Sequence, residues 1–145
     1  MATLLIDDME IIELAKLKSI LRLEISEDFP NLSDGKSNRL IKMLSENYRL
    51  WLGDFGAGQA SLKALHDGLY DAVKIDEDFF SVYSKSIIWP AIIKNIMRYC
   101  KCTIIIGVNN FDKIIEVKND ISAIQLGDSD TIPFDDIDKV NNKIQ

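Results

Sequence analysis

The sequence predicts an α/β fold in which a parallel β-sheet is covered by helices. Short apolar or β-branched segments alternate with amphipathic segments of helical periodicity along the chain. The intervening segments are about 10–15 residues long, as expected for βα crossovers, and turn-forming residues separate the two kinds of segment. We therefore expect five parallel strands, near residues 21–25, 49–54, 71–75, 103–108 and 121–125.

The helices of the N-terminal half follow from periodicity and turn residues. Apolar side chains recur at helical spacing over residues 7–20, ahead of the first strand. The turn-rich stretch "FPNLSDGKSN" then offers Ser33 or Asp34 as the N-cap of a helix over residues 36–47. The second strand runs directly into the Gly-rich turn "GDFGAG", after which a helix is expected over residues 59–69.

The C-terminal half continues the same alternation. A long helical pattern covers residues 84–100, and Pro90 within it predicts a kink or a break between a short helix and a longer one. The stretch "CTIIIGV" is continuously apolar and β-branched, which is typical of a buried strand. A short helix over 111–120 and a final helix over 133–143, with Pro133 near its first turn, complete the expected elements.

Length and charge limit the classes of function. The chain has 145 residues, 47% hydrophobic and 28% charged, so we expect one water-soluble domain over residues 1–145. Its net charge of −6 disfavours direct binding to nucleic acid, which requires a basic face. The N-terminus has acids in place of the basic start of a signal peptide, and the apolar runs are too short to cross a bilayer. We therefore expect a cytoplasmic protein without membrane contact.

Individual reactive residues give little support for catalysis. Cys100 and Cys102 lie close together without a cluster of further His or Cys residues, which favours reduced thiols over a zinc site. His66, the single histidine, falls in a helical pattern and is expected to face solvent instead of acting as a general base. The acidic runs "DDME", "IDEDFF" and "PFDDIDK" are typical of solvated faces, with a contact surface for a basic partner as the alternative.

Polar and glycine residues gather where the expected strands end, which is where parallel α/β sheets hold functional sites. These positions are Glu24, Glu27, Gly53, Asp54, Lys74, Asp76, Gly107, Asn109 and Gln125. Carboxylates beside a lysine indicate a metal or phosphate site. Acids at strand ends also cap helices, and the pattern alone does not decide between the two interpretations.

Taken in order, the strand ends resemble the EAL-domain family of cyclic-di-GMP phosphodiesterases, which fold as a (β/α)8 barrel. The matching segments are "LRLEISE", "GDFGAG", "VKIDEDFF", "IIIGVNN" and "AIQLG". The resemblance implies parallel βα units that form the C-terminal part of such a barrel, about five strands, incomplete in one chain. Barrels of this type need about 250 residues, so we expect the chain to begin near the middle of the barrel.

The resemblance also assigns roles to the strand-end residues. In the family, carboxylates on the strand ends hold two metal ions that activate a water for attack on a phosphodiester. The residues that match this site, and form a vestigial metal or nucleotide site here, are Glu24, Asp54, Lys74, Asp76 and Gln125. Family ligands are lost at Gly53, Ile106 and Asn109. The resemblance therefore implies no catalytic residue, no bound metal and no cofactor.

Within the family, the chain most resembles a degenerate branch of flagellar regulators. This rests on "FPNLSDGKSNR", "LGDFGAGQASLKALHDGLYDAVKID" and "YCKCTIIIGV". It implies an inactive protein that binds the FlhD subunit of the flagellar master activator FlhDC and inhibits it. The alternatives are a cyclic-di-GMP sensor without hydrolysis and a phosphodiesterase completed across a dimer. The open edges of a partial barrel also predict a homodimer.

Overall fold

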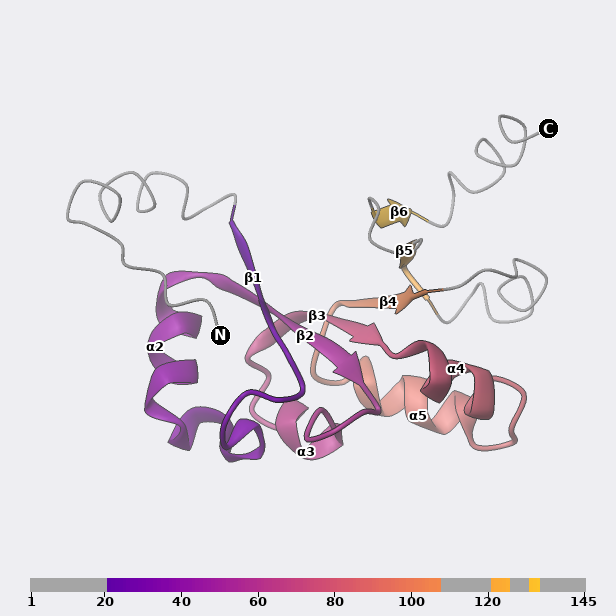
Figure 1. The fold of residues 1–145 in the computed structure, drawn as a ribbon, viewed down its shortest axis with the longest axis horizontal. Coiled ribbons are helices and arrows are strands. Elements are labelled where there is room, and N and C mark those ends of the chain that lie inside the picture. Colours follow the sequence, from indigo (N-terminus) through magenta and orange to yellow (C-terminus); the bar gives the residue numbers. More distant parts are fainter. Residues whose placement is uncertain (1–20, 108–120, 126–130, 134–145) are drawn as a thin grey trace.

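The computed structural model describes residues 21–107, 121–125 and 131–133 (Figure 1). Within these residues one sheet has the strand order β1 (Arg22–Ile25), β2 (Arg49–Phe55), β3 (Tyr70–Ile75), β4 (Cys102–Ile106), β5 (Ala123–Gln125) and β6 (Thr131–Pro133). The first five strands run parallel, each paired with the next along the chain. The predicted series of five parallel strands is therefore confirmed.

The sixth strand corrects the predicted C-terminal helix at its first residue. Pro133 does not begin a helix but ends β6, which pairs antiparallel with β5 and places Pro133 opposite Ala123. Thr131 and Ile132 are β-branched and favour an extended chain. Proline is tolerated because β6 is an edge strand among those described. The remaining predicted helical segments, 7–20, 111–120 and 134–143, lie outside the described residues.

The described helices are η1 (Leu32–Ser37), α2 (Arg39–Asn47), α3 (Leu62–Leu65), α4 (Glu77–Tyr83) and α5 (Trp89–Ile96). The N-cap of α2 is Asn38, and the prediction of Ser33 or Asp34 is wrong. The Asn38 side-chain oxygen accepts two backbone N–H groups of the first turn, at 3.1 and 3.3 Å. The reason is Gly35, whose φ of 53° interrupts the helical conformation and forces α2 to begin later.

The prediction of a short and a longer helix over residues 84–100 is wrong, because residues 84–88 form turns and a single helix, α5, begins at Trp89. Helix α4 ends at Tyr83, and Pro90 lies in the first turn of α5, where its missing N–H costs no helical hydrogen bond. The rings of Phe80 and Trp89 meet edge to face, with centroids 5.5 Å apart, and join the two helices. In the described part of the chain, no helix is both long and apolar enough to cross a bilayer.

The two faces of the sheet bury different side chains. The main core lies between the sheet and the helices, where Leu52 and Ile105 pack with Ile96 of α5. In Figure 1, α3, α4 and α5 gather on one side of β2, β3 and β4. The opposite face carries a small cluster of Ala72, Ile104 and Ala123, with Trp51 and Cys102 against it. This face corresponds to the interior of a closed barrel, and the carboxyl ends of its strands hold the predicted site residues.

Candidate functional site

A cavity of about 350 Å³ opens at the carboxyl ends of the parallel strands. Its lining residues are Glu24, Lys74, Asp76, Glu77, Ile106, Gly107 and Gln125. The structure thus brings four of the five predicted site residues to one cavity, together with Ile106, one of the positions of ligand loss. Asp54 lies close enough to interact electrostatically with Glu24 and Asp76 but does not line the cavity. Asn109 lies outside the described residues.

An ion pair between Lys74 and Glu24 dominates this cavity. The two residues lie near the ends of β3 and β1, on either side of β2, and the Lys74 Nζ donates to Glu24 Oε2 at 2.5 Å. The Lys74 side chain is only 10% exposed, whereas that of Glu24 is 43% exposed. The ammonium also lies 5.7 Å from the ring centroid of Trp51, within range of a cation–π contact. The lysine is therefore neutralised by the one carboxylate that the family pattern retains on β1.

Asp54 has an unusual backbone and an unusual carboxyl group. Its φ of 47° lies in the left-handed region, which Asp tolerates better than most residues. Burial raises the pKa of Asp54 to about 6, assisted by a hydrogen bond with Glu27 and by the negative charges of Glu27, Glu24 and Asp76. The raised pKa therefore reflects the partial burial of Asp54 and the carboxylates gathered around it.

Asp76 has a structural role at this strand end. Its side chain caps α4 and accepts the backbone N–H of Phe79 at 2.8 Å. The helix-capping interpretation of strand-end acids is therefore confirmed for this residue. Its backbone N–H donates to the carbonyl of Phe55 at 3.2 Å, which ties the end of β3 to the end of β2.

Carboxylates lie close to two glycines at the strand ends, Gly53, a position of ligand loss, and Gly107. A Cβ atom at Gly53 would lie 2.8 Å from Glu24 Oε1, so the ion-paired carboxylate fills the space of the missing side chain. At Gly107, with φ of 74°, a Cβ would lie 2.5 Å from Glu77 Oε2. The side-chain oxygen of Gln125 is buried without a hydrogen-bond partner among the described residues. Among the described residues that line the cavity, it is the one buried side-chain oxygen without a hydrogen-bond partner.

Glu77 belongs to the cavity although the sequence did not identify it. The acidic run "IDEDFF" predicts a solvated face, and the structure places Glu77 in the lining beside Gly107. Its position directly after the strand-end Asp76 is the signal that could have identified it. His66 is confirmed as exposed, with a side chain 77% accessible to solvent. Cys100 and Cys102 are both free thiols, and burial raises the pKa of Cys100 to about 11.

The donor set does not fit a pair of divalent metal ions. Mg²⁺ requires about six oxygen ligands in strict geometry. Glu24 is paired with Lys74, Asp76 is engaged as a helix cap, and Gly53 and Ile106 provide no oxygen side chain. Within the described ranges, no group of three or more His, Cys, Asp or Glu residues is arranged to hold a metal ion. We therefore derive no metal-dependent step from this arrangement.

Comparison with known proteins relates this site to its family. The EAL domain family model matches residues 5–110. The anti-FlhC(2)FlhD(4) factor YdiV of Salmonella arizonae is 34% identical over 111 residues, which cover 74% of this chain and 47% of that protein. The putative anti-FlhC(2)FlhD(4) factor YdiV of Escherichia coli strain K12 is also 34% identical, over 72% of this chain and 46% of that protein. The chain thus spans about half the length of these relatives.

Solved structures agree with the sequence comparison. The crystal structure of the EAL-like domain protein YdiV has a TM-score of 0.72 at 32% identity, over 94% of this chain and 60% of that chain. An EAL domain protein from Listeria monocytogenes EGD-e, with a TM-score of 0.51 at 15% identity over 92% of this chain and 69% of that one, supports the fold alone. The parallel strands in chain order, the motifs at their carboxyl ends and the family match over most of the chain lead to one conclusion: this chain belongs to the EAL domain family.

Proposed function

We propose that this chain is a catalytically inactive EAL-type regulator that acts by binding a protein, and that the protein is the flagellar activator FlhDC. The relatives that support this partner carry the name anti-FlhC(2)FlhD(4) factor. Because the chain spans about half of their length, the proposal requires that a sufficient part of the binding surface lies within it. A regulator of a transcription factor acts in the cytoplasm, which fits the predicted location.

The single observation that carries the inactive assignment is the absence of a carboxylate at Gly53 and Ile106, while the retained Glu24 is paired with Lys74. Hydrolysis by two metal ions needs several free carboxylates around the attacked phosphodiester. Here the ammonium lies 2.5 Å from a Glu24 oxygen, where it competes with any cation for that carboxylate. Gly53 and Ile106 add no charge to replace it. A phosphodiesterase completed by a second identical chain would lack the same carboxylates.

The proposed regulator forms a homodimer through an open sheet edge. Among the described strands, β1 has a paired neighbour on one side only. An unpaired edge presents backbone donors and acceptors that a second chain can satisfy. Strand β1 also carries Arg22 and Glu24, and charged residues on an edge limit uncontrolled pairing. A discrete dimer is therefore expected in place of aggregation.

The test is a mass measurement in solution. The purified protein is examined by size-exclusion chromatography with light scattering, alone and with the purified FlhD–FlhC complex. We expect a dimer alone and a heavier species with the activator. Two separate peaks with the masses of the unmixed components would refute the partner. Turnover of cyclic-di-GMP with Mg²⁺ or Mn²⁺ by the unaltered protein would refute the inactive assignment.

A second candidate function is a cyclic-di-GMP sensor without hydrolysis. The strand-end cavity of about 350 Å³ and the unsatisfied oxygen of Gln125 favour it. The charges oppose it, because Glu24, Asp76 and Glu77 line the cavity and Lys74 is the one cationic residue among its described walls. A dinucleotide with two negative phosphodiesters would meet a net negative surface. Isothermal titration with cyclic-di-GMP separates the two functions, and saturable binding in the micromolar range would favour the sensor.

A further inference from the structure

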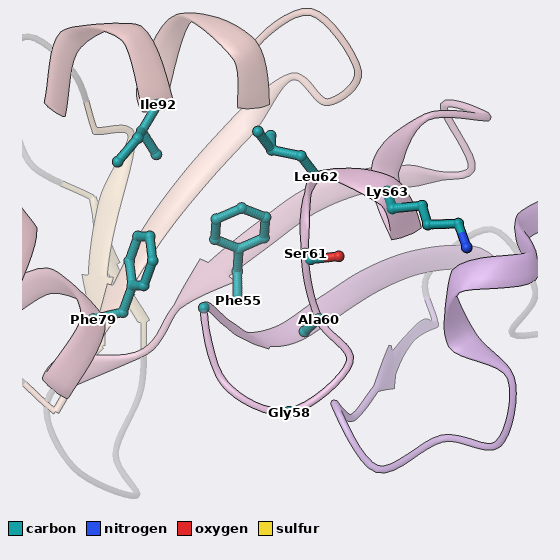
Figure 2. Close-up of a pocket in the computed structure, with 9 residues that line it drawn as sticks. Phe55, Gly58, Ala60, Ser61, Leu62, Lys63, Phe79 and Ile92 are labelled. Carbon is teal, nitrogen blue, oxygen red and sulfur yellow. The ribbon is translucent and has the colours of Figure 1, made fainter. Parts of the chain in front are cut away.

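A second cavity, of about 430 Å³, opens on the helix-covered side of the sheet, and the site described above does not use it. Its walls are the loop after β2, the single turn of α3, and helices α4 and α5 (Figure 2). Phe55, Phe79, Leu62 and Ile92 supply its apolar lining, and the stem of Lys63 forms part of its edge. Helix α3, which contributes Leu62 and Lys63 to the lining, is only four residues long.

The cavity is formed in advance by a loop that backbone hydrogen bonds hold in place. The Gly56 N–H donates to the Ala60 carbonyl at 2.8 Å, and the Ala60 N–H donates to the Ala57 carbonyl at 3.0 Å. The rings of Phe55 and Phe79 meet edge to face, with centroids 5.7 Å apart. A ligand that packs against this preformed lining therefore loses little free energy in ordering the site, which favours tight binding.

The mouth of the cavity is apolar on one side and positive on the other. Leu62 in the lining is 39% exposed. Figure 2 shows that the Lys63 ammonium points away from the two phenyl rings, so that the charge lies beside the cavity and not within it. In the described part of the chain, no acidic side chain forms an ion pair with Lys63. The ammonium is therefore free to pair with a partner.

The separation between the apolar cavity and the charge of Lys63 favours a protein segment over a small molecule as the ligand. A small molecule confined to the apolar cavity would not reach the ammonium of Lys63, which points away from it. A protein segment extends over both regions, with an apolar side chain in the cavity and an acidic residue opposite the lysine. Apolar anchors in preformed pockets are where binding energy concentrates in protein interfaces, and charge complementarity adds specificity and association rate.

We propose that this cavity receives an apolar anchor side chain from an amphipathic segment of the protein partner, and that an acidic residue of the same segment pairs with Lys63. The inference rests on the proposed function, since it locates the surface by which the chain binds the activator. It adds a contact that lies apart from the strand-end cavity, so that binding of the partner does not require the vestigial site.

The experiment measures the affinity for the FlhD–FlhC complex by biolayer interferometry. Leu62→Asp and Lys63→Glu change the proposed surface. Leu40→Asp and Lys42→Glu are matched controls on α2, where Leu40 is 47% exposed and Lys42 is also exposed. We expect a Kd at least about tenfold weaker for Leu62→Asp and about fivefold weaker for Lys63→Glu at low salt. Both controls should stay within about twofold of the unaltered protein.

The possible outcomes separate the inference from the proposed function. Binding by the unaltered protein with equal affinity of Leu62→Asp and its control would overturn the inference and leave the proposed function standing. No binding by the unaltered protein would overturn both. Hydrogen exchange of the unaltered protein provides a readout that is independent of the folding of any variant. Residues 56–63 should gain protection in the complex, and unchanged exchange there would contradict the proposal.

Discussion

Replacement of Asp54 by asparagine should stabilise the protein at neutral pH and have a much smaller effect near pH 4. Burial raises the pKa of Asp54 from its ordinary value of 3.8 to about 6, with hydrogen bonding and nearby carboxylates as smaller causes. The folded state thus holds a proton that the unfolded state releases between these values. The contribution of Asp54 to the stability of the unaltered protein therefore falls as the pH rises from about 4 to about 6.

The magnitude follows from the same pKa values. A rise from 3.8 to about 6 corresponds to about 3 kcal/mol of lost stability above pH 6 if the full effect is realised. Asp54 is only partly buried, and solvent screening reduces this to about 1 kcal/mol. The asparagine side chain would carry no charge at any pH and would avoid this loss. For a chain of this size, about 1 kcal/mol raises the Tm by about 3–5 °C.

The assay is urea unfolding followed by the fluorescence of Trp51 and Trp89 at pH 4 and pH 8. Dilute protein is needed because the isoelectric point is near 4.7. Asparagine also favours the left-handed backbone of Asp54, but that contribution does not depend on pH. The informative quantity is therefore the difference between the two pH values. An equal gain at both would refute the argument, and the exposed Asp28→Asn provides the control.

Two further predictions concern backbone strain and the ion pair. Gly56→Ala should cost more than about 2 kcal/mol by chemical denaturation, because φ is 104° and a Cβ would collide with the ring of Phe79. Gly68→Ala should cost about 1 kcal/mol, because φ is 63° but a Cβ would lie 3.9 Å from the Tyr99 carbonyl oxygen, an ordinary contact distance. Glu24→Gln should cost about 2 kcal/mol, because it leaves the buried ammonium of Lys74 unpaired. Lys74→Met should cost less, since the half-exposed carboxylate keeps its water, and an equal or larger loss would contradict this ordering.

The sequence alone was sufficient to predict the parallel strands. It was not sufficient to predict the places where a single residue changes the conformation of the backbone. The strand "CTIIIGV" is identifiable because β-branched residues fit a pleated, buried surface. The N-cap of α2 was not identifiable, because nothing in "FPNLSDGKSN" indicates that Gly35 takes a positive φ and moves the helix start to Asn38. Pro133 was misassigned because a proline is equally compatible with a first helical turn and with an edge strand.

In the candidate site too, the sequence predicts some features, and others depend on the tertiary structure. Sequence motifs place Glu24, Lys74 and Gln125 at strand ends, and the parallel register brings them to one cavity. The motifs do not say which carboxylate Lys74 selects, because the two residues are 50 positions apart and meet only through the register of three strands. The left-handed backbone of Asp54 and its raised pKa likewise depend on tertiary surroundings.

The proposed loss of catalysis involves more than the deletion of ligands. An aspartate restored at Gly53 would place its Cβ 2.8 Å from Glu24 Oε1, so the carboxylate that remains obstructs the one that is missing. A new negative charge at this position would also disfavour ionisation of Asp54, whose pKa is already raised to about 6. Lys74 would remain paired with Glu24 and would compete with a metal ion for that carboxylate. Because Ile106 also lacks a carboxylate, no single substitution would restore a two-metal centre, which agrees with the proposed role as a binding module.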